Sequence, residues 1–377
     1  MQWKSRSSLR RTLRWVWIYF LYWTGLILWA RRRIESSAGI IVLTFHRVLE
    51  DEDVSRSDSS PGMIVRRSTF EDLLRFLTTQ CEMVSLAAVP SWAKRKNRLR
   101  IAVTFDDGWR DTSEIAFPLT QKWRVPTTVF VCPGLVGKAV PFWPEHVGRA
   151  WRIVLQYPQQ KIRFETICRE AGLQRQSRNP TAAGQLEALL SQLKQLPASE
   201  LERTVQKFVD FARATPLALE VSSPDATMTW EETARIASQG AQIGSHTQSH
   251  QILTTISAST VQSELSESKR ILESRLALPC TLFAYPNGYW STEVHDHVVK
   301  AGYSLAFVNS LGIWNSDIDL WLIPRVNIWE GSLIGPSGRF SPAVFLYLTL
   351  WRTYRAEVRR RKKKSRSQRA GKDFEAA

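Results

Sequence analysis

Two short segments, about 140 residues apart, carry carboxylates and imidazoles at spacings that could do chemistry together. The first, residues 104–108, reads TFDDG and places two carboxylates side by side at the end of an apolar run. The second, residues 244–250, reads GSHTQSH and places two imidazoles at positions i and i+4. Such a set can hold a divalent metal with one open position and keep a base beside it, which is the minimum for metal-assisted hydrolysis.

The two carboxylates are expected to do different work. Successive side chains diverge, so Asp106 and Asp107 do not readily bind one metal together. One is expected to be a ligand, and the other is then free to accept a proton. The spacing of His246 and His250 predicts that they lie on one helical turn. Two structural histidines are the alternative, because core packing also produces this spacing.

The elements that must position these side chains alternate between strands and helices, which predicts a parallel α/β fold. The chain contains β-rich runs at 39–45, 99–105, 127–132, 242–245, 282–285 and 304–309. Residues after parallel strands share one face of a barrel, so those that follow such runs are expected to converge. They are His46, Asp106, Asp107, His246, Asn287 and Arg325.

Residues 140–225 interrupt this alternation and are predicted to form a helical insertion between barrel elements. Trp143 and His146 fall in it and are candidates for a wall of the cleft, with aromatic core packing as the alternative.

Three motifs in this order resemble the polysaccharide deacetylases, carbohydrate esterase family 4 or the NodB-homology domain: TFDDG, GSHTQSH, and FAYPNG at residues 283–288. The resemblance covers about residues 38–139 and 226–330. It implies a distorted, incomplete (β/α) barrel that removes N-acetyl, and sometimes O-acetyl, groups from amino-sugar polymers. FAYPNG is similar to the subgroup that acts in exopolysaccharide and cell-surface glycan synthesis.

The resemblance also implies roles for individual residues. Asp107, His246 and His250 correspond to the ligands of a divalent metal, usually zinc, and Asp106 corresponds to the general base. In the third motif a backbone N–H at Asn287 is expected to help hold an oxyanion. The rest of the substrate and oxyanion pocket is expected from Tyr285, Pro286 and Gly288.

Two departures from the family pattern need substitutes. Many members have an arginine that pairs with the base, and here that position is Ala284, so we expect Arg325 to supply the charge. The family's last motif usually holds a histidine as general acid, but no histidine follows His297. His46 is the candidate, because imidazole suits protonation of a leaving amine. A surface Arg325 and a structural His46 are the alternatives.

The formal charge of +16 is concentrated at the two ends of the chain. Residues 1–33 carry eight Lys/Arg and no acid, residues 352–377 carry eleven and three acids, and residues 34–351 are neutral. A nucleic-acid enzyme more often has basic charge on its folded domain, so no nucleic-acid partner is expected. Basic arms beside apolar segments instead predict contact with an anionic membrane surface.

Residues 15–30 are sixteen residues without a charge. As one helix they would span about 24 Å, short of the ~30 Å hydrocarbon core. A tilted spanning anchor, an interfacial helix and a buried helix of the fold all remain open. We expect association with a bacterial cell membrane through residues 15–30, on a side that the charges leave undecided. The six consecutive bases at 359–364 fit the same surface, or a solvated tail.

These observations predict three regions: a basic N-terminal segment with an apolar membrane-associating helix (1–37), a deacetylase-like barrel with an insertion at about 140–225 (38–340), and an apolar helix with a polybasic tail (341–377). The leading hypothesis is a metal-dependent hydrolase that deacetylates N-acetylated amino sugars of a surface polysaccharide or its lipid-linked precursor. The alternatives are a non-catalytic glycan-binding or scaffold protein of a polysaccharide synthesis complex, and an O-deacetylase.

Overall fold

The computed structural model describes residues 2–37, 39–86, 98–140, 142–174, 181–215 and 224–362. Its centre is an eight-stranded parallel sheet in the order β1-β10-β9-β8-β7-β6-β5-β4. A further pairing between β1 and β5 closes this sheet into a ring of seven strands, and the short β4 pairs with the beginning of β5. The strands are β1 (Ile40–Phe45), β4 (Glu82–Met83), β5 (Arg100–Phe105), β6 (Thr127–Val131), β7 (Gln242–Ser245), β8 (Leu282–Ala284), β9 (Leu305–Val308) and β10 (Ile323–Asn327).

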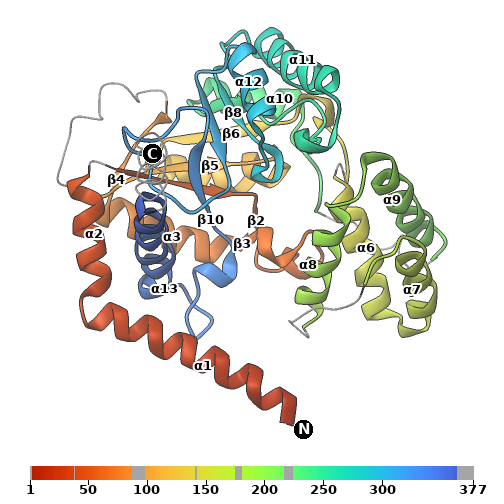
Figure 1. Ribbon diagram of the computed structural model, residues 1–377, viewed down its shortest axis with the longest axis horizontal. Coiled ribbons are helices and arrows are strands. Elements are labelled where there is room, and N and C mark those ends of the chain that lie inside the picture. The colour runs from red at the N-terminus through yellow and green to blue at the C-terminus, as the bar shows by residue number, and fades with distance from the viewer. Residues whose placement is uncertain are drawn as a thin grey trace, which may run out of the picture.

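The predicted (β/α) barrel is therefore confirmed, with seven strands in the ring (Figure 1). All six residues of β1 and of β5 are buried, as expected for parallel strands covered on both faces. The covering helices are α3 (Arg67–Gln80), α5 (Phe117–Lys122), α10 (Trp230–Ser238), α11 (Ala258–Leu276) and α12 (Thr292–Lys300). A two-stranded sheet of β2 (Arg47–Leu49) and β3 (Ile64–Arg66) lies beside the ring and was not predicted from the sequence.

Helix ends follow local capping chemistry. The Thr229 side chain and Glu232 form a reciprocal capping box at the start of α10, and the Ser257 hydroxyl accepts from the Thr260 N–H at the start of α11. Helix α3 begins at Arg67 without such a cap, since the Arg66 side chain before it makes no capping hydrogen bond.

The insertion forms a helical body with a hydrophobic core of its own. Its helices are α6 (Trp143–Gln156), α7 (Lys161–Glu170), α8 (Ala182–Leu193) and α9 (Ala198–Arg213). In Figure 1 this body stands to one side of the barrel, with α8 and α6 nearest to the strand ends.

The chain ends pack together on the barrel. Residues 15–30 do not form the single helix that was expected: α1 (Gln2–Trp23) and α2 (Leu26–Ser36) are separated at Gly25, whose φ of 78° is left-handed. They pack against α13 (Pro342–Leu346) and the π-helical turn η11 (Tyr347–Arg352), beyond which residues 353–362 are helical. Lys363 and Lys364 of the basic run lie outside the described residues. No helix in the described ranges has the length and apolarity needed to cross a membrane.

Candidate active site

Strand alternation brings the candidate residues to one end of the barrel. A cluster inside the ring contains Val42 of β1, Ala102 of β5 and Ile323 of β10. Side chains alternate between the two faces of a strand, so a residue two or four positions beyond one of these also faces inward. These are His46, Asp106 and Arg325.

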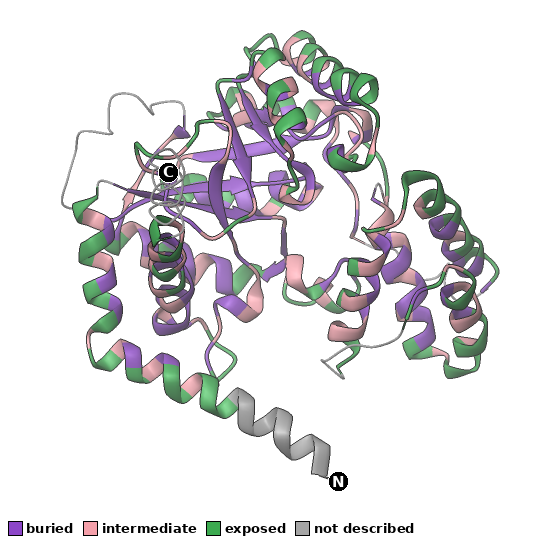
Figure 2. Ribbon diagram, in the orientation of Figure 1, coloured by how far each residue is buried: buried purple, intermediate pink, exposed green. Residues whose placement is uncertain are grey.

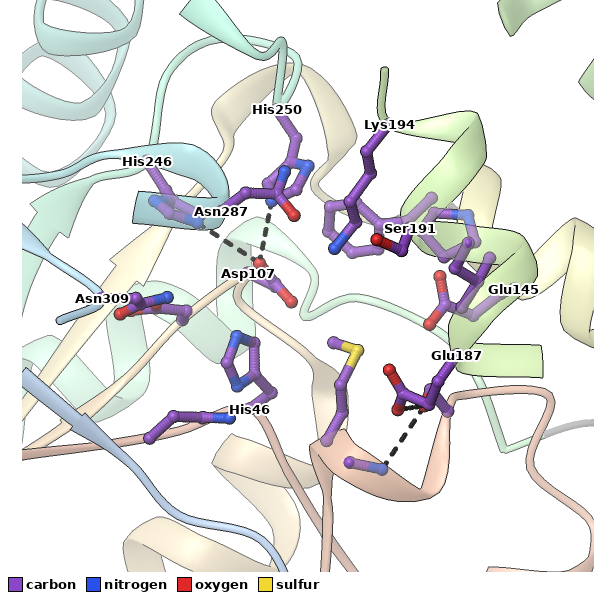
Figure 3. A pocket seen from close by; sticks show the side chains of 18 of the residues that line it. His46, Asp107, Glu145, Glu187, Ser191, Lys194, His246, His250, Asn287 and Asn309 are labelled. Atoms are coloured by element: carbon purple, nitrogen blue, oxygen red, sulfur yellow. Dashed lines mark hydrogen bonds and ion pairs between the residues drawn. The ribbon is translucent and has the colours of Figure 1, made fainter. Parts of the chain in front are cut away.

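The three predicted ligands come together. Asp107 Oδ1 lies 3.4 Å from Nε2 of His246 and 3.4 Å from Nε2 of His250 (Figure 3). One ligand atom from each residue lies within 4.8 Å of the others. His246 Nδ1 donates to the Ala284 carbonyl at 2.7 Å, which leaves Nε2 free to bind a metal. The Trp109 indole donates to the other oxygen of Asp107 at 3.0 Å and fixes the carboxylate plane.

This donor set fits a divalent cation. Asp107 Oδ1 is buried and has no hydrogen-bond partner among the described residues, although two imidazole nitrogens face it. A metal ion would satisfy all three atoms at once. Two imidazoles and one carboxylate with an open position are a donor set typical of catalytic zinc.

The histidine motif does not form the helical turn that its spacing predicted. Residues 246–250 are a loop in which Thr247 has a φ of 66° and His250 a φ of 60°. Asp107 also has a positive φ, 75°. Left-handed backbone at non-glycine residues is costly and persists only where the surroundings impose it, as at functional sites. Here the Thr247 hydroxyl accepts from the His250 N–H, and Glu264 accepts from the Ser249 N–H and hydroxyl.

The second carboxylate, Asp106, is held by the arginine that the sequence nominated. Arg325 Nη1 and Nη2 each donate to one oxygen of Asp106 at 2.7 Å, and both side chains are buried. The guanidinium lies in the barrel interior, 5.3 Å from the ring centroid of Phe130. Burial by itself would raise the pKa of Asp106, but Arg325 and the imidazoles of His246 and His46 hold that pKa below its ordinary value. Asp106 is therefore ionised and fixed in orientation.

His46 lines the same cavity on the other side of Asp107 (Figure 3). Its Nδ1 is buried and has no hydrogen-bond partner among the described residues. Burial lowers the pKa of the imidazole, against the opposing influence of Asp107 and Asp106. No described contact gives this side chain a structural task, and it remains a candidate for proton transfer.

The third motif divides between pocket and core. Asn287 lines the cavity with a φ of 55°, and Gly288 follows with a φ of 72°. A Cβ on Gly288 would lie 2.4 Å from the backbone nitrogen of Asn309, so the turn packs directly on the strand end beside it. The expectation that Tyr285 and Pro286 shape the pocket is not supported by the described lining. Alternation turns Tyr285 outward, where it packs against Phe283 in the core.

The cavity has a volume of about 320 Å³, and the insertion supplies one wall of it. Figure 3 shows four polar side chains from α6, α8 and the end of α8 that face the candidate metal ligands across the cavity. They are Glu145, Glu187, Ser191 and Lys194. None of them was predicted, because helical periodicity identifies an apolar face but not the polar side chains that a neighbouring domain will meet. Trp109 and Asn309, by contrast, follow predicted strands and could have been nominated.

A buried ion network joins this wall to the barrel. Arg47 donates to Asp111 at 2.7 Å and to Asp225 at 2.5 Å, and its guanidinium lies 4.1 Å from the Trp109 ring centroid. The Ser59 hydroxyl accepts from Arg47 at 2.8 Å and donates to Glu145 at 3.0 Å. Burial, reinforced by the charge of Asp225, raises the pKa of Glu145 to about 8. Trp109, whose indole donates to Asp107, is therefore held by the same network that joins the insertion to the barrel.

The two residues predicted to form a wall of the cleft do not line this cavity. Trp143 and His146 line a second cavity of about 370 Å³, which shares only His250 with the first.

Comparisons with known proteins agree with this architecture. Residues 211–306, which contain the histidine and FAYPNG motifs, match the family model described as polysaccharide deacetylase. A 104-residue stretch is 27% identical to YxkH, a predicted polysaccharide deacetylase of Bacillus subtilis (strain 168). That match covers 28% of this chain and 37% of YxkH, so it spans little more than a third of the relative's length.

A solved structure shows the same fold over most of the chain. The Streptococcus pyogenes deacetylase PplD in complex with acetate is 15% identical, with a TM-score of 0.51. The match covers 82% of this chain and 98% of PplD.

Proposed function

The chain belongs to the polysaccharide deacetylase family, and from this premise we propose that it is a zinc-dependent hydrolase of N-acetylated amino sugars. The substrate is an N-acetylhexosamine unit of a surface polysaccharide or of its lipid-linked precursor. The observation that carries the proposal is the pairing of two carboxylates with different partners. Asp107 faces two imidazoles at 3.4 Å, while Asp106 beside it accepts two hydrogen bonds from Arg325.

The metal would be held by Asp107, His246 and His250. When bound, a divalent cation polarises the acetyl carbonyl and lowers the pKa of water next to it. The protein's own contribution is to fix Asp107 and His246 before binding, through Trp109 and the Ala284 carbonyl.

Asp106 is placed to take the proton from the attacking water. A general base must be ionised and within hydrogen-bond reach of the proton that it removes. Arg325 meets the first requirement by stabilising the carboxylate and helps with the second by fixing its plane. Both oxygens of Asp106 already accept from Arg325, so the base uses its remaining lone pairs and does not swing away from the site.

His46 and Asn287 would complete the reaction. The backbone N–H of Asn287 stabilises the negative charge that develops on the acetyl oxygen. His46 gives a proton to the departing amine, which otherwise leaves poorly. Because its Nδ1 has no partner among the described residues, the imidazole can hold its proton toward the cavity.

A non-catalytic binding protein would not need this arrangement. Sugar binding calls for hydroxyl-matching groups such as those on the insertion wall, and it does not call for a buried Asp–Arg pair beside a metal-type triad. The insertion wall itself suits a sugar, because Glu145, Glu187 and Lys194 offer both acceptors and donors to ring hydroxyls.

The test is acetate release from N-acetylglucosamine oligomers by the full chain, with metal content measured in the same samples. We expect a chelator to abolish release and added Zn²⁺ to restore it. Asp106→Asn should keep the metal and lose activity, whereas Asp107→Asn should lose both. Asp72→Asn makes the same change at an exposed carboxylate on α3 and should alter neither.

Two outcomes would contradict the proposal. Activity that survives Asp106→Asn would remove Asp106 as base, and a protein that binds the oligomers but never releases acetate would be a binding module. An acetyl ester assayed in parallel distinguishes N- from O-deacetylation: faster ester cleavage at equal substrate would replace the amide as the preferred bond.

A further inference from the structure

The outer face of the N-terminal helices concentrates exposed apolar side chains. Of the fourteen large apolar side chains exposed in the described ranges, eight lie between residues 13 and 29. Those on α1 recur every three or four residues, which places them on one face of the helix. They are Leu13, Val16, Trp17, Phe20 and Trp23, and Trp23 is 80% exposed. Figure 2 shows exposed and buried positions alternating along the described part of these N-terminal helices.

The face continues onto α2 and is backed by the barrel. Leu26, Leu28 and Trp29 are exposed, while Ile27 between them is fully buried. The inner side chains of both helices are at most 1% exposed and pack toward α13 and η11: Ile18, Leu21, Ile27, Ala30 and Ile34. The Tyr19 hydroxyl also lies 3.1 Å from the Ser341 hydroxyl. Both helices are therefore fixed to the domain with an apolar side left in solvent.

The charges around this face are basic. The Arg14 guanidinium lies 5.4 Å from the Trp15 ring centroid, and that of Arg33 lies 5.4 Å from the Trp29 ring centroid. Tyr354 packs edge-on against Trp29, with 5.1 Å between the ring centroids, so the helical residues 353–362 lie beside α2. This segment exposes further arginines, while its one acid, Glu357, is buried and bound by Arg360 and Arg361.

We propose that the outer face of α1 and α2, here called the docking face, binds in the plane of an anionic lipid bilayer without crossing it. Aromatic and aliphatic side chains on one face with arginines beside them are the composition of interfacial helices. To span a bilayer, residues 15–30 would have to straighten at Gly25 and withdraw Ile18, Leu21 and Ile27 from the protein core. In-plane docking keeps every one of these contacts and covers the exposed rings.

The docking face is connected to the candidate active site through the segment after β10. The catalytic cavity continues into an open cavity along Trp329, Glu330 and Gly331, because the two share Gly62, Glu187 and Asn327. The same segment reaches Tyr19 of α1 at Gly335 and Ser341. If the proposed function holds, a glycan attached to the membrane could enter the site along this route, although docking itself does not depend on activity.

Co-sedimentation with vesicles tests the docking face. We expect the full chain to bind phosphatidylcholine vesicles that contain phosphatidylglycerol, to bind pure phosphatidylcholine less, and to lose part of its binding in high salt. Trp17→Gln/Trp23→Gln should weaken binding by roughly tenfold or more, because two buried rings are lost from the lipid contact. Leu155→Gln/Ile162→Gln changes two equally exposed apolar residues on the insertion and should bind like the wild type.

Thermal melts establish that both double variants fold. No binding by the wild type, or equal loss in both variants, would overturn the docking face.

Depth is measured separately with Phe20→Cys carrying a fluorophore, since the four native cysteines are buried. In-plane docking predicts strongest quenching by lipids brominated near the headgroup. Strongest quenching by lipids brominated near the bilayer centre would show a spanning segment and overturn the in-plane geometry.

Discussion

Replacing Arg325 by methionine removes the charge that holds the candidate base while keeping a long side chain in the barrel interior. Both Arg325–Asp106 hydrogen bonds are 2.7 Å long and lie between fully buried side chains. Removing one member of a buried ion pair costs about 3–5 kcal/mol, because the other charge stays buried without a partner. The free energy of unfolding should fall by about this amount in Arg325→Met.

The same change should lower kcat by roughly 10²-fold with little change in KM. General-base catalysis contributes about 10²–10⁴-fold, and part of that depends on the ionisation and orientation of Asp106. The acetyl sugar itself is expected to contact the metal and the insertion wall, so its binding should be preserved. Acetate release per folded enzyme measures both constants, and metal content shows that the neighbouring Asp107 site is intact.

A double-mutant cycle separates a specific pair from general damage. Asp106→Asn combined with Arg325→Met should lose at least about 2 kcal/mol less stability than the two changes added together, since neither buried charge is then left alone. Arg47→Met is the matched control, because Arg47 is equally buried but is paired with Asp111 and Asp225. Its effect should add to that of Asp106→Asn. If the stability losses of Asp106→Asn and Arg325→Met simply add, or if kcat is unchanged in Arg325→Met, then Arg325 does not support the candidate base.

Three further predictions follow from single residues. Burial and Asp225 raise the pKa of Glu145 to about 8 from about 4.3 in the unfolded chain, so the folded protein binds more protons between these values and its stability falls as pH rises, by up to about 1.4 kcal/mol per unit. Glu145→Gln should flatten that slope in denaturation curves, and a parallel curve would contradict the burial argument. His46→Gln should lower kcat by roughly 10²-fold with metal retained, and full turnover would exclude His46 as the acid. Gly288→Ala should lower stability by about 2 kcal/mol, because its Cβ meets the Asn309 backbone at a positive φ; an unchanged melting temperature would show that the turn yields.

The strands were predictable because a strand that is buried on both faces appears in the sequence as a continuous apolar run. Runs such as 99–105 and 127–132 are continuous apolar segments that end in polar residues, and the structure places β5 and β6 there. The convergence of His46, Asp106 and Arg325 followed from the same rule, since parallel strands deliver their ends to one face. The short β2, β3 and β4 were missed, as two or three residues carry no periodicity.

Backbone conformation was harder to predict from the sequence than the positions of the strands. The spacing of His246 and His250 suits a helix as well as a loop, and only the left-handed φ of Thr247 and His250 decides between them. The break between α1 and α2 had a visible signal in Gly25, since an isolated glycine lowers helical propensity. The apolar continuity on both sides of Gly25 outweighed that signal in the prediction.

The arginine that holds the candidate base illustrates how a site could keep its chemistry while one of its residues moves to another strand. At the family position on β8 this chain has Ala284, which leaves space in the ring interior. Arg325 pairs in register with Val42 of β1, and β1 also pairs with β5, the strand that carries Asp106 at its end. A long side chain that points inward one layer below the strand ends can therefore reach Asp106 from β10. The barrel constrains the guanidinium to its interior above Phe130 and Phe307, and it does not constrain which strand supplies it.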